Sequence, residues 1–185
     1  MNSSFPLAPP LDRGWIAQHI PHSGSMCLLD QVAAWDAESI HCTATSHLDP
    51  HNPLRAHGRL AAVCGVEYAA QAMAVHGALL GALSGAGHDR PRAGFLASVR
   101  DVEAHTASLD TAEGPLLVEA ERLSGTGNTI LYRFALRSGE RLLLTGRAAV
   151  MLDAAGMMQT DLPAMDRPSI DEPAPPHVLQ AADQS

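Results

Sequence analysis

The chain has 185 residues, of which 46% are hydrophobic, and its formal net charge is −8. This length suits one domain with a sizeable core, and the negative charge argues against non-specific binding to nucleic acid, which needs a basic face. Cys27, Cys42 and Cys64 lack CxxC spacing, which favours reduced thiols in a cytoplasmic protein over a disulfide framework. The opening sequence MNSSFPLAPP has neither the basic nor the apolar region of a signal peptide.

The first part of the chain predicts a short helix followed by a β-hairpin. Residues 1–11 are proline-rich and are expected to form a flexible segment, and residues 12–20 are expected to form a helix capped by Asp12. PHSGSM is turn-like. CLLDQVAAWD and SIHCTATSH are predicted strands joined by the turn DAES, and the second shows the alternation of a half-buried strand at Ile40 and Cys42.

A long apolar run follows the irregular segment LDPHNPLRAHG. It predicts a helix that begins near Gly58 or Leu60 and ends at the segment SGAGHDRPR. The run is long enough to span a bilayer. However, it is rich in Ala and Gly and carries Glu67, Gln71 and His76 near its centre, so a buried helix is favoured over a membrane span.

Four more strands are predicted after the helix, at AGFLASVRDV, PLLVEAERL, TILYRFAL and RLLLTGRAAVML. The turns between them, DTAEGP, SGTGN and RSGE, predict antiparallel hairpins. Residues 153–185 contain five of the thirteen prolines and are expected to be a disordered tail. Two strands, a helix that is apolar on nearly every face and four strands predict an α+β hotdog fold over residues 12–152. In this fold a curved antiparallel sheet wraps around one long central helix.

Three segments carry a resemblance to a known family. IPHSGSMCLLDQV is similar to a Pro-His segment that leads into a Leu-Leu-x-Asp strand, GVEYAAQAMA to a central helix with a catalytic acid, and AGFLASVRDVE to a strand that lines an acyl tunnel. Together they resemble the hotdog-fold 3-hydroxyacyl-acyl-carrier-protein dehydratases of fatty acid synthesis, and most closely the branch linked to aryl polyene pigments. One part departs from that family: there is no Gly-His-Phe-Pro-Gly tract, and Pro53 stands where its histidine would be.

The resemblance implies dehydration of 3-hydroxyacyl thioesters to trans-2-enoyl thioesters, without a cofactor. Such a reaction needs a base, an acid and a group that stabilises the enolate-like charge. Glu67 is expected to be the acid, because an apolar setting raises the pKa of a carboxyl group, and His22 is expected to be the base. The missing tract leaves His47, His51 and His57 as alternative bases.

The residues expected to bind substrate lie on or just before the helix. Gln71 lies one turn after Glu67 on the same face and can hold either the carboxyl group or a substrate oxygen, whereas His76 lies on the opposite face. The family uses an amide at the start of the central helix, and Cys64 and Gly65 are nearest to that place. Gly65 has an equally good explanation in tight helix packing. For Glu67 the alternative is a buried ion pair with an arginine.

Three histidines in one loop raise the possibility of a metal, but their irregular spacing, without a firm pattern of Cys or carboxylate ligands, predicts none. The expected partner is an acidic acyl carrier protein with a phosphopantetheine-linked substrate, and the active unit is expected to be a homodimer or a heterodimer with another hotdog subunit. Two groups of arginines could meet the carrier: Arg55 and Arg59, and Arg90, Arg92 and Arg100.

Two alternative functions remain open from the sequence. A hotdog acyl thioesterase would use Glu67 to activate water or to attack the thioester. A non-catalytic hotdog subunit would instead stabilise an active dehydratase partner, and the absent Gly-His-Phe-Pro-Gly tract favours this interpretation. The acyl chain length and the presence of an aryl head group are not determined by the sequence.

Overall fold

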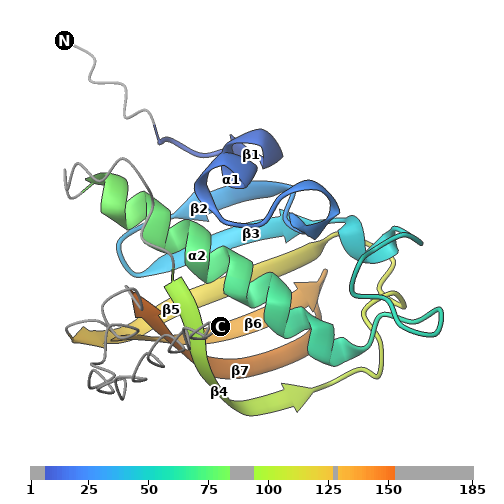
Figure 1. The fold of residues 1–185 in the computed structure, drawn as a ribbon. Helices are drawn as coiled ribbons and strands as arrows, with labels where there is room; N and C mark the ends of the chain where they lie inside the picture. Colours follow the sequence, from blue (N-terminus) through green and yellow to red (C-terminus); the bar gives the residue numbers. More distant parts are fainter. Residues whose placement is uncertain (1–6, 84–93, 127–128, 153–185) are drawn as a thin grey trace, which may run out of the picture.

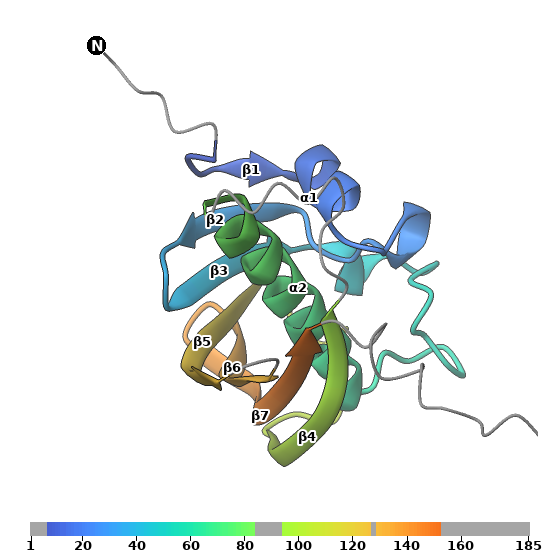
Figure 2. The same ribbon diagram turned by 60° about the vertical axis from the view of Figure 1, so that its left-hand side comes forward.

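A seven-stranded antiparallel sheet curves around one long helix in the computed structural model, which describes residues 7–83, 94–126 and 129–152 (Figure 1). The strand order is β1-β2-β3-β5-β6-β7-β4. The turned view in Figure 2 shows the sheet wrapping around the helix. The predicted hotdog fold is therefore confirmed. The elements are β1 (Leu11–Asp12), α1 (Arg13–His19), β2 (Gln31–Trp35), β3 (Ser39–Ala44), α2 (Gly65–Leu83), β4 (Gly94–Ala104), β5 (Leu116–Thr126), β6 (Thr129–Ser138) and β7 (Arg141–Leu152), with 3-10 turns η1 (Gly24–Met26), η2 (Ser46–Leu48) and η3 (Ala62–Cys64).

The core lies between α2 and the concave face of the sheet. Small residues such as Ala69 and Ala72 are fully buried on α2, so the helix can lie close to the strands. The facing strands contribute alternate side chains, among them Val118, Phe134 and Leu136, which are 2% exposed or less. This alternation explains why the sequence of β5 to β7 predicted strands.

Two local predictions in the first part of the chain are confirmed. Helix α1 is capped by Asp12, whose Oδ1 accepts the backbone N–H of Trp15 at 2.8 Å. Strands β2 and β3 form a hairpin whose turn is closed by Asp36, because its Oδ1 accepts the amides of Glu38 at 2.8 Å and Ser39 at 2.7 Å.

The predicted strand at 27–36 is shorter in the structure, because β2 begins at Gln31. Cys27, Leu28 and Leu29 are buried without belonging to a strand. An apolar run of this kind satisfies the hydrophobic pattern of a strand, but here it packs as a loop beside α2. The N-terminal segment also contributes to the sheet, since Leu11 pairs with Val32.

The prediction that the helix begins near Gly58 or Leu60 is wrong, because α2 begins at Gly65. Residues 56–59 form a tight turn in which Ala56 and Arg59 exchange backbone hydrogen bonds of 2.9 and 3.0 Å. Gly58 has a φ of +74°, a left-handed conformation that a right-handed helix excludes. A 3-10 turn over residues 62–64 then leads into α2.

The predicted hairpin between the first two strands after the helix is also wrong. β4 pairs with β7 at the edge of the sheet, whereas β5 lies between β3 and β6. The connection between β4 and β5 runs beside the segment that precedes α2, where Leu109 donates its amide to the carbonyl of Leu60 at 2.8 Å. The hairpins β5–β6 and β6–β7 are as predicted.

Within the described residues, no helix is long and apolar enough to cross a membrane. The predicted helix-ending segment SGAGHDRPR and the predicted tail after residue 152 lie outside the described residues.

Candidate active site

His22 and Glu67, the two residues expected to be catalytic, are in direct contact. His22 lies in the loop between α1 and η1, and Glu67 is the third residue of α2. The imidazole Nε2 is 3.1 Å from the carboxyl Oε1, and the two side chains are 27% and 32% exposed. A proton can move directly between groups at this distance, and both remain within reach of a ligand.

Gln71 holds Glu67 and also the loop that carries His22. Its Nε2 donates to Glu67 Oε1 at 2.9 Å and to the carbonyl of Met26 at 2.8 Å, and its Oε1 accepts the amide of Leu28 at 2.9 Å. The side chain is completely buried. Of the two roles expected for Gln71, the contact with the carboxyl group is present in the structure, and substrate binding stays a prediction.

The loop around His22 is held on several sides. Pro21 precedes the histidine and restricts the backbone. Gly24 takes a φ of +57°, and its carbonyl accepts a hydrogen bond from Arg13 Nη2 at 3.2 Å. The buried Cys27 and Leu28 then anchor the end of the loop in the core. The sequence contains no local signal for the bonds between this loop and Gln71.

The start of α2 holds the two residues expected to supply an amide to the substrate. In this structure the Cys64 amide donates to the carbonyl of Ala61 at 3.0 Å, and the Gly65 amide donates within the same turn. A Cβ on Gly65 would lie 2.7 Å from a methyl carbon of Leu144 and 2.8 Å from one of Leu136, so tight packing accounts for this glycine. Substrate binding by Cys64 or Gly65 stays a prediction.

The Cys64 side chain is half-buried. Its Sγ lies 3.6 Å from the carbonyl of Leu54, and burial raises the pKa of the thiol. A raised pKa leaves the sulfur protonated near neutral pH, which does not suit a nucleophile.

The three alternative histidines make no described contact with Glu67. His47 is fully buried beside the backbone of Ala112 and Gly114, and burial lowers its pKa. His51 is 91% exposed, with Nδ1 3.4 Å from a carboxylate oxygen of Asp49. His57 is exposed in the turn before α2. Within the described part of the chain, no group of three or more His, Cys, Asp or Glu side chains could hold a metal ion.

Arg55 has a structural role, because its guanidinium is bonded to groups of the protein itself. Its guanidinium lies 2.7 Å from Asp110 and donates to the carbonyls of His47 at 3.0 Å, Asp49 at 2.9 Å and Gly58 at 3.2 Å. Its side chain is only 16% exposed. The interpretation of Arg55 as a docking residue is therefore corrected: it braces the loop that precedes α2.

The other predicted arginines differ in their positions. Arg59 and Arg100 are exposed, whereas Arg90 and Arg92 lie outside the described residues. Among the described ion pairs, Glu67 contacts no arginine, so the alternative of a buried ion pair between them finds no support.

His76 lies on the opposite side of α2 from Glu67, as the helical spacing predicts. Its Nδ1 is 3.0 Å from the hydroxyl of Tyr132, and its Nε2 is 2.9 Å from the carbonyl of Asp36. The ring is fully buried, and burial lowers its pKa. Its role is therefore in packing between α2 and the sheet.

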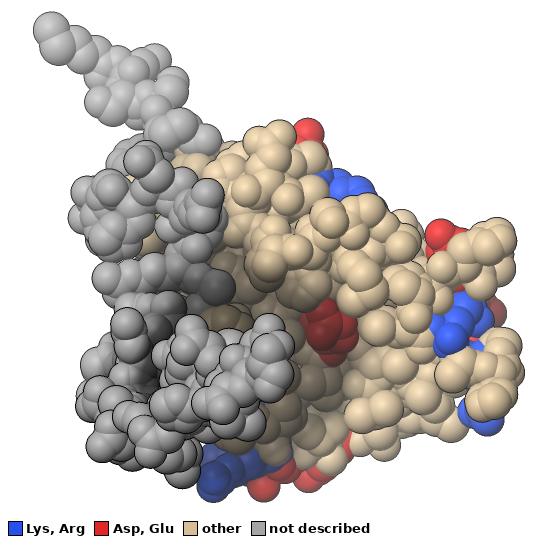
Figure 3. All heavy atoms as spheres, viewed as in Figure 1, with Lys and Arg blue, Asp and Glu red and all other residues tan. Residues whose placement is uncertain are grey.

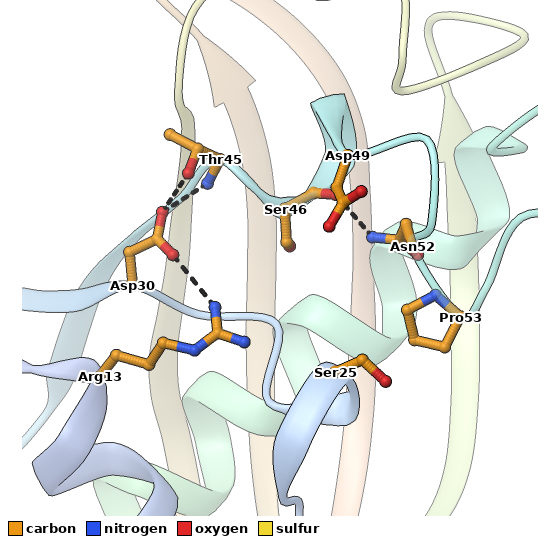
Figure 4. Close-up of a pocket in the computed structure, with 8 residues that line it drawn as sticks. All are labelled: Arg13, Ser25, Asp30, Thr45, Ser46, Asp49, Asn52 and Pro53. Carbon is orange, nitrogen blue, oxygen red and sulfur yellow. Dashed lines mark hydrogen bonds and ion pairs between the residues drawn. The ribbon is translucent and has the colours of Figure 1, made fainter.

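A polar cavity of about 210 Å³ lies between the loop that carries η1 and the loop that carries η2 (Figure 4). Asp30 forms one side of it and is held by Thr45, whose amide and hydroxyl donate to Asp30 Oδ2 at 2.7 and 2.6 Å. Neither His22 nor Glu67 lines this cavity. The lining residues are Arg13, Ser25, Asp30, Thr45, Ser46, Asp49, Asn52 and Pro53.

On the described part of the face that carries α2, one acidic group lies in a hollow near the middle and the other charged groups lie toward the margin (Figure 3). The carboxyl group of Glu67 and the imidazole of His22 are both partly exposed, so they form an acid–base pair that a ligand can reach. This arrangement suits proton transfer to and from an acyl group.

Comparison with solved structures agrees with the fold. The structure of the dehydratase heterocomplex ApeI:P from Xenorhabdus doucetiae matches with a TM-score of 0.68 and 20% identity, over 82% of this chain and 97% of that chain. A hypothetical protein from Staphylococcus aureus matches with a TM-score of 0.48 and 12% identity, over 66% of this chain and 91% of that chain. A thioesterase from Haemophilus influenzae matches with a TM-score of 0.45 and 15% identity, over 66% of this chain and 77% of that chain.

The sequence comparisons are more specific. No curated protein matches the chain. The family model for ApeP-like proteins, described as ApeP dehydratase, matches residues 15–159. This range contains the whole described sheet from β2 onward, together with His22, Glu67 and Gln71. The chain therefore belongs to the ApeP-like dehydratase family.

Proposed function

We propose that this protein dehydrates 3-hydroxyacyl thioesters carried on an acyl carrier protein and yields trans-2-enoyl thioesters. The observation that carries the proposal is the 3.1 Å contact between His22 Nε2 and Glu67 Oε1, with Gln71 holding the carboxyl group in place. Elimination of water requires one proton to leave the α-carbon and one to reach the departing hydroxyl. A carboxyl group that is held at an accessible position, with an imidazole in contact, can serve these transfers.

The test is incubation of the purified protein with a 3-hydroxyacyl carrier protein, followed by intact mass analysis. The expected result is loss of one water from a thioester that stays attached to the carrier. Glu67→Gln should abolish this loss, and Glu103→Gln, an exposed carboxylate on β4, is the matched control that should retain it. Release of free acid in place of the enoyl thioester would establish the thioesterase alternative and refute the proposal.

A second candidate function is that of a subunit in a two-protein dehydratase. It is favoured by the absence of the Gly-His-Phe-Pro-Gly tract and by the solved ApeI:P heterocomplex, to which this chain is similar in fold. The edge strand β4 also leaves apolar side chains in solvent: Phe95, Leu96 and Val102 are 53%, 41% and 40% exposed. We propose that another hotdog subunit covers this edge, in a heterodimer in preference to a homodimer.

An assay of dehydratase activity distinguishes these two functions. It compares the protein alone with the protein mixed with a hotdog dehydratase subunit. If Glu67→Gln abolishes activity of the mixture, this chain contributes a catalytic group. If the mixture is unaffected by Glu67→Gln, the chain is a structural subunit and our primary proposal fails.

The family match also suggests the pathway. We propose that the carrier belongs to aryl polyene-type biosynthesis in the cytoplasm, in preference to general fatty acid synthesis, because the matching family model describes ApeP dehydratases. Comparing turnover of carrier-bound substrates with and without an aryl end group tests this preference.

A further inference from the structure

The hydrogen bonds of Gln71 determine the direction of the bond between Gln71 and Glu67. The Leu28 amide can only donate and the Met26 carbonyl can only accept, so the carboxamide of Gln71 has a single possible orientation. Its second N–H must then donate to Glu67 Oε1 at 2.9 Å. This oxygen is therefore an acceptor, and among the described residues no group donates to the second oxygen, Oε2.

His22 has only one nitrogen that can carry its proton without an unsatisfied donor. Its Nδ1 is buried and has no hydrogen-bond partner, whereas its Nε2 lies 3.1 Å from Glu67 Oε1. A proton on Nδ1 would create a buried N–H without an acceptor, which folded proteins rarely tolerate. A lone pair there is the less costly choice. The geometry therefore favours a neutral imidazole with its proton on Nε2, the nitrogen that lies beside Glu67.

This arrangement is at odds with His22 as the base. A neutral ring with its proton on Nε2 has its only free lone pair on Nδ1, which is buried and does not face the carboxyl group. The free oxygen of Glu67, in contrast, can both accept and return a proton. Since His22 and Gln71 both contact Oε1, that oxygen is occupied and Oε2 is left for the substrate.

We propose that Glu67 carries out both proton transfers of the dehydration through Oε2, and that His22 is a neutral positioning residue beside Oε1. The Cα–H bond breaks and its proton moves to Oε2, while its electron pair forms the Cα=Cβ bond. The Cβ–O bond breaks with its electron pair on oxygen, and this oxygen takes the proton back from Oε2 and leaves as water. The carboxylate is regenerated without an external proton, and the α-proton and the hydroxyl leave from the same face. This inference rests on the proposed function.

The first experiment observes the imidazole directly and needs no substrate. Long-range proton–nitrogen NMR of protein labelled with ¹⁵N at its ten histidines reports which ring nitrogen carries the proton, and the His22→Gln spectrum identifies the His22 signals by their loss. We expect Nε2 to be protonated and Nδ1 to be bare near neutral pH. A proton on Nδ1 with a bare Nε2, or a doubly protonated ring, would overturn the inference.

The second experiment uses the fact that a glutamine side chain can donate from Nε2 but cannot act as a base. His22→Gln should retain dehydratase activity within about tenfold, whereas His22→Ala should lose about ten- to a hundredfold, in the range seen when a residue that orients a ligating or reacting group is removed. His105→Gln, an exposed histidine after β4, is the matched control. If His22→Gln loses about 10²–10⁴-fold, as expected for a missing general base, His22 is the base and the inference fails.

The two experiments separate this inference from the proposed function. If the wild-type protein shows no dehydratase activity, with or without a hotdog partner, the proposed function fails while the NMR result still decides the proton position. If the wild-type protein is active and the NMR spectrum shows a bare Nε2, only the inference fails.

Discussion

Replacing Gln71 with methionine, a side chain of similar length without polar groups, tests how the site is held together. The substitution removes three hydrogen bonds and leaves the buried Leu28 amide and the partly buried Met26 carbonyl without their partner. Each buried group left unsatisfied costs about 1–3 kcal/mol. Glu67 is partly exposed and can turn to water, so the third bond contributes little. We therefore expect the free energy of unfolding to fall by roughly 2–6 kcal/mol, less where the Met26 carbonyl reaches water.

The effect on catalysis should exceed the effect of instability alone. Without Gln71 the loop that carries His22 loses its bond to α2, and Glu67 loses the donor that holds Oε1. A misplacement of about 1 Å in a reacting group can lower the rate by about a hundredfold. Dehydratase turnover, measured under conditions where the variant is fully folded, should thus fall by roughly ten- to a hundredfold.

Urea denaturation followed by circular dichroism measures the first quantity, and the carrier-protein assay measures the second. Gln18→Met, at an exposed position of α1, is the matched control and should change neither. A loss of less than about 1 kcal/mol together with unchanged turnover would refute the reasoning that Gln71 joins the loop to the helix.

Three further predictions concern the frame around the site. Gly65→Ala should destabilise the fold by about 1–3 kcal/mol, because the added Cβ would lie under 3 Å from two leucine methyl groups; unchanged thermal stability would show that packing does not require glycine. Arg55→Met should cost roughly 3 kcal/mol, since it leaves the largely buried Asp110 without its cation, and a double-mutant cycle with Asp110→Asn should show coupling between the two side chains. Stability should fall as the pH drops below about 6.5, because burial lowers the pKa of His47 and His76 in the folded protein. The unfolded chain then binds more protons than the folded chain. Equal free energies of unfolding in urea at pH 7.5 and pH 5.5 would contradict this prediction.

Features that depend on neighbours a few residues away could be predicted from the sequence. The cap of α1 by Asp12 involves a residue three positions on, and the contact between Glu67 and Gln71 joins residues one helical turn apart. The position of His76 on the opposite side of α2 follows from the same helical geometry. In each case the regular backbone of the helix places the side chains, so the sequence spacing is enough to predict the contact or the helix face.

Features that depend on the path of the chain could not be predicted in this way. The residues of β4 and β5 predict two strands but not their partners, and the simplest choice, a hairpin between consecutive strands, was wrong. The helix start was misplaced because an apolar sequence does not reveal the left-handed backbone at Gly58. The brace formed by Arg55 likewise depends on Asp110, which lies 55 residues later.

The sequence by itself determined the kinds of element, the hotdog arrangement and the helical face on which Glu67 and Gln71 lie. Only the tertiary structure decided that His22, and none of the loop histidines, contacts Glu67, and that Gln71 ties the two segments together across 45 residues. The physical reason is that periodicity specifies which side of an element is buried, whereas packing and long-range hydrogen bonds decide which distant loop meets that side.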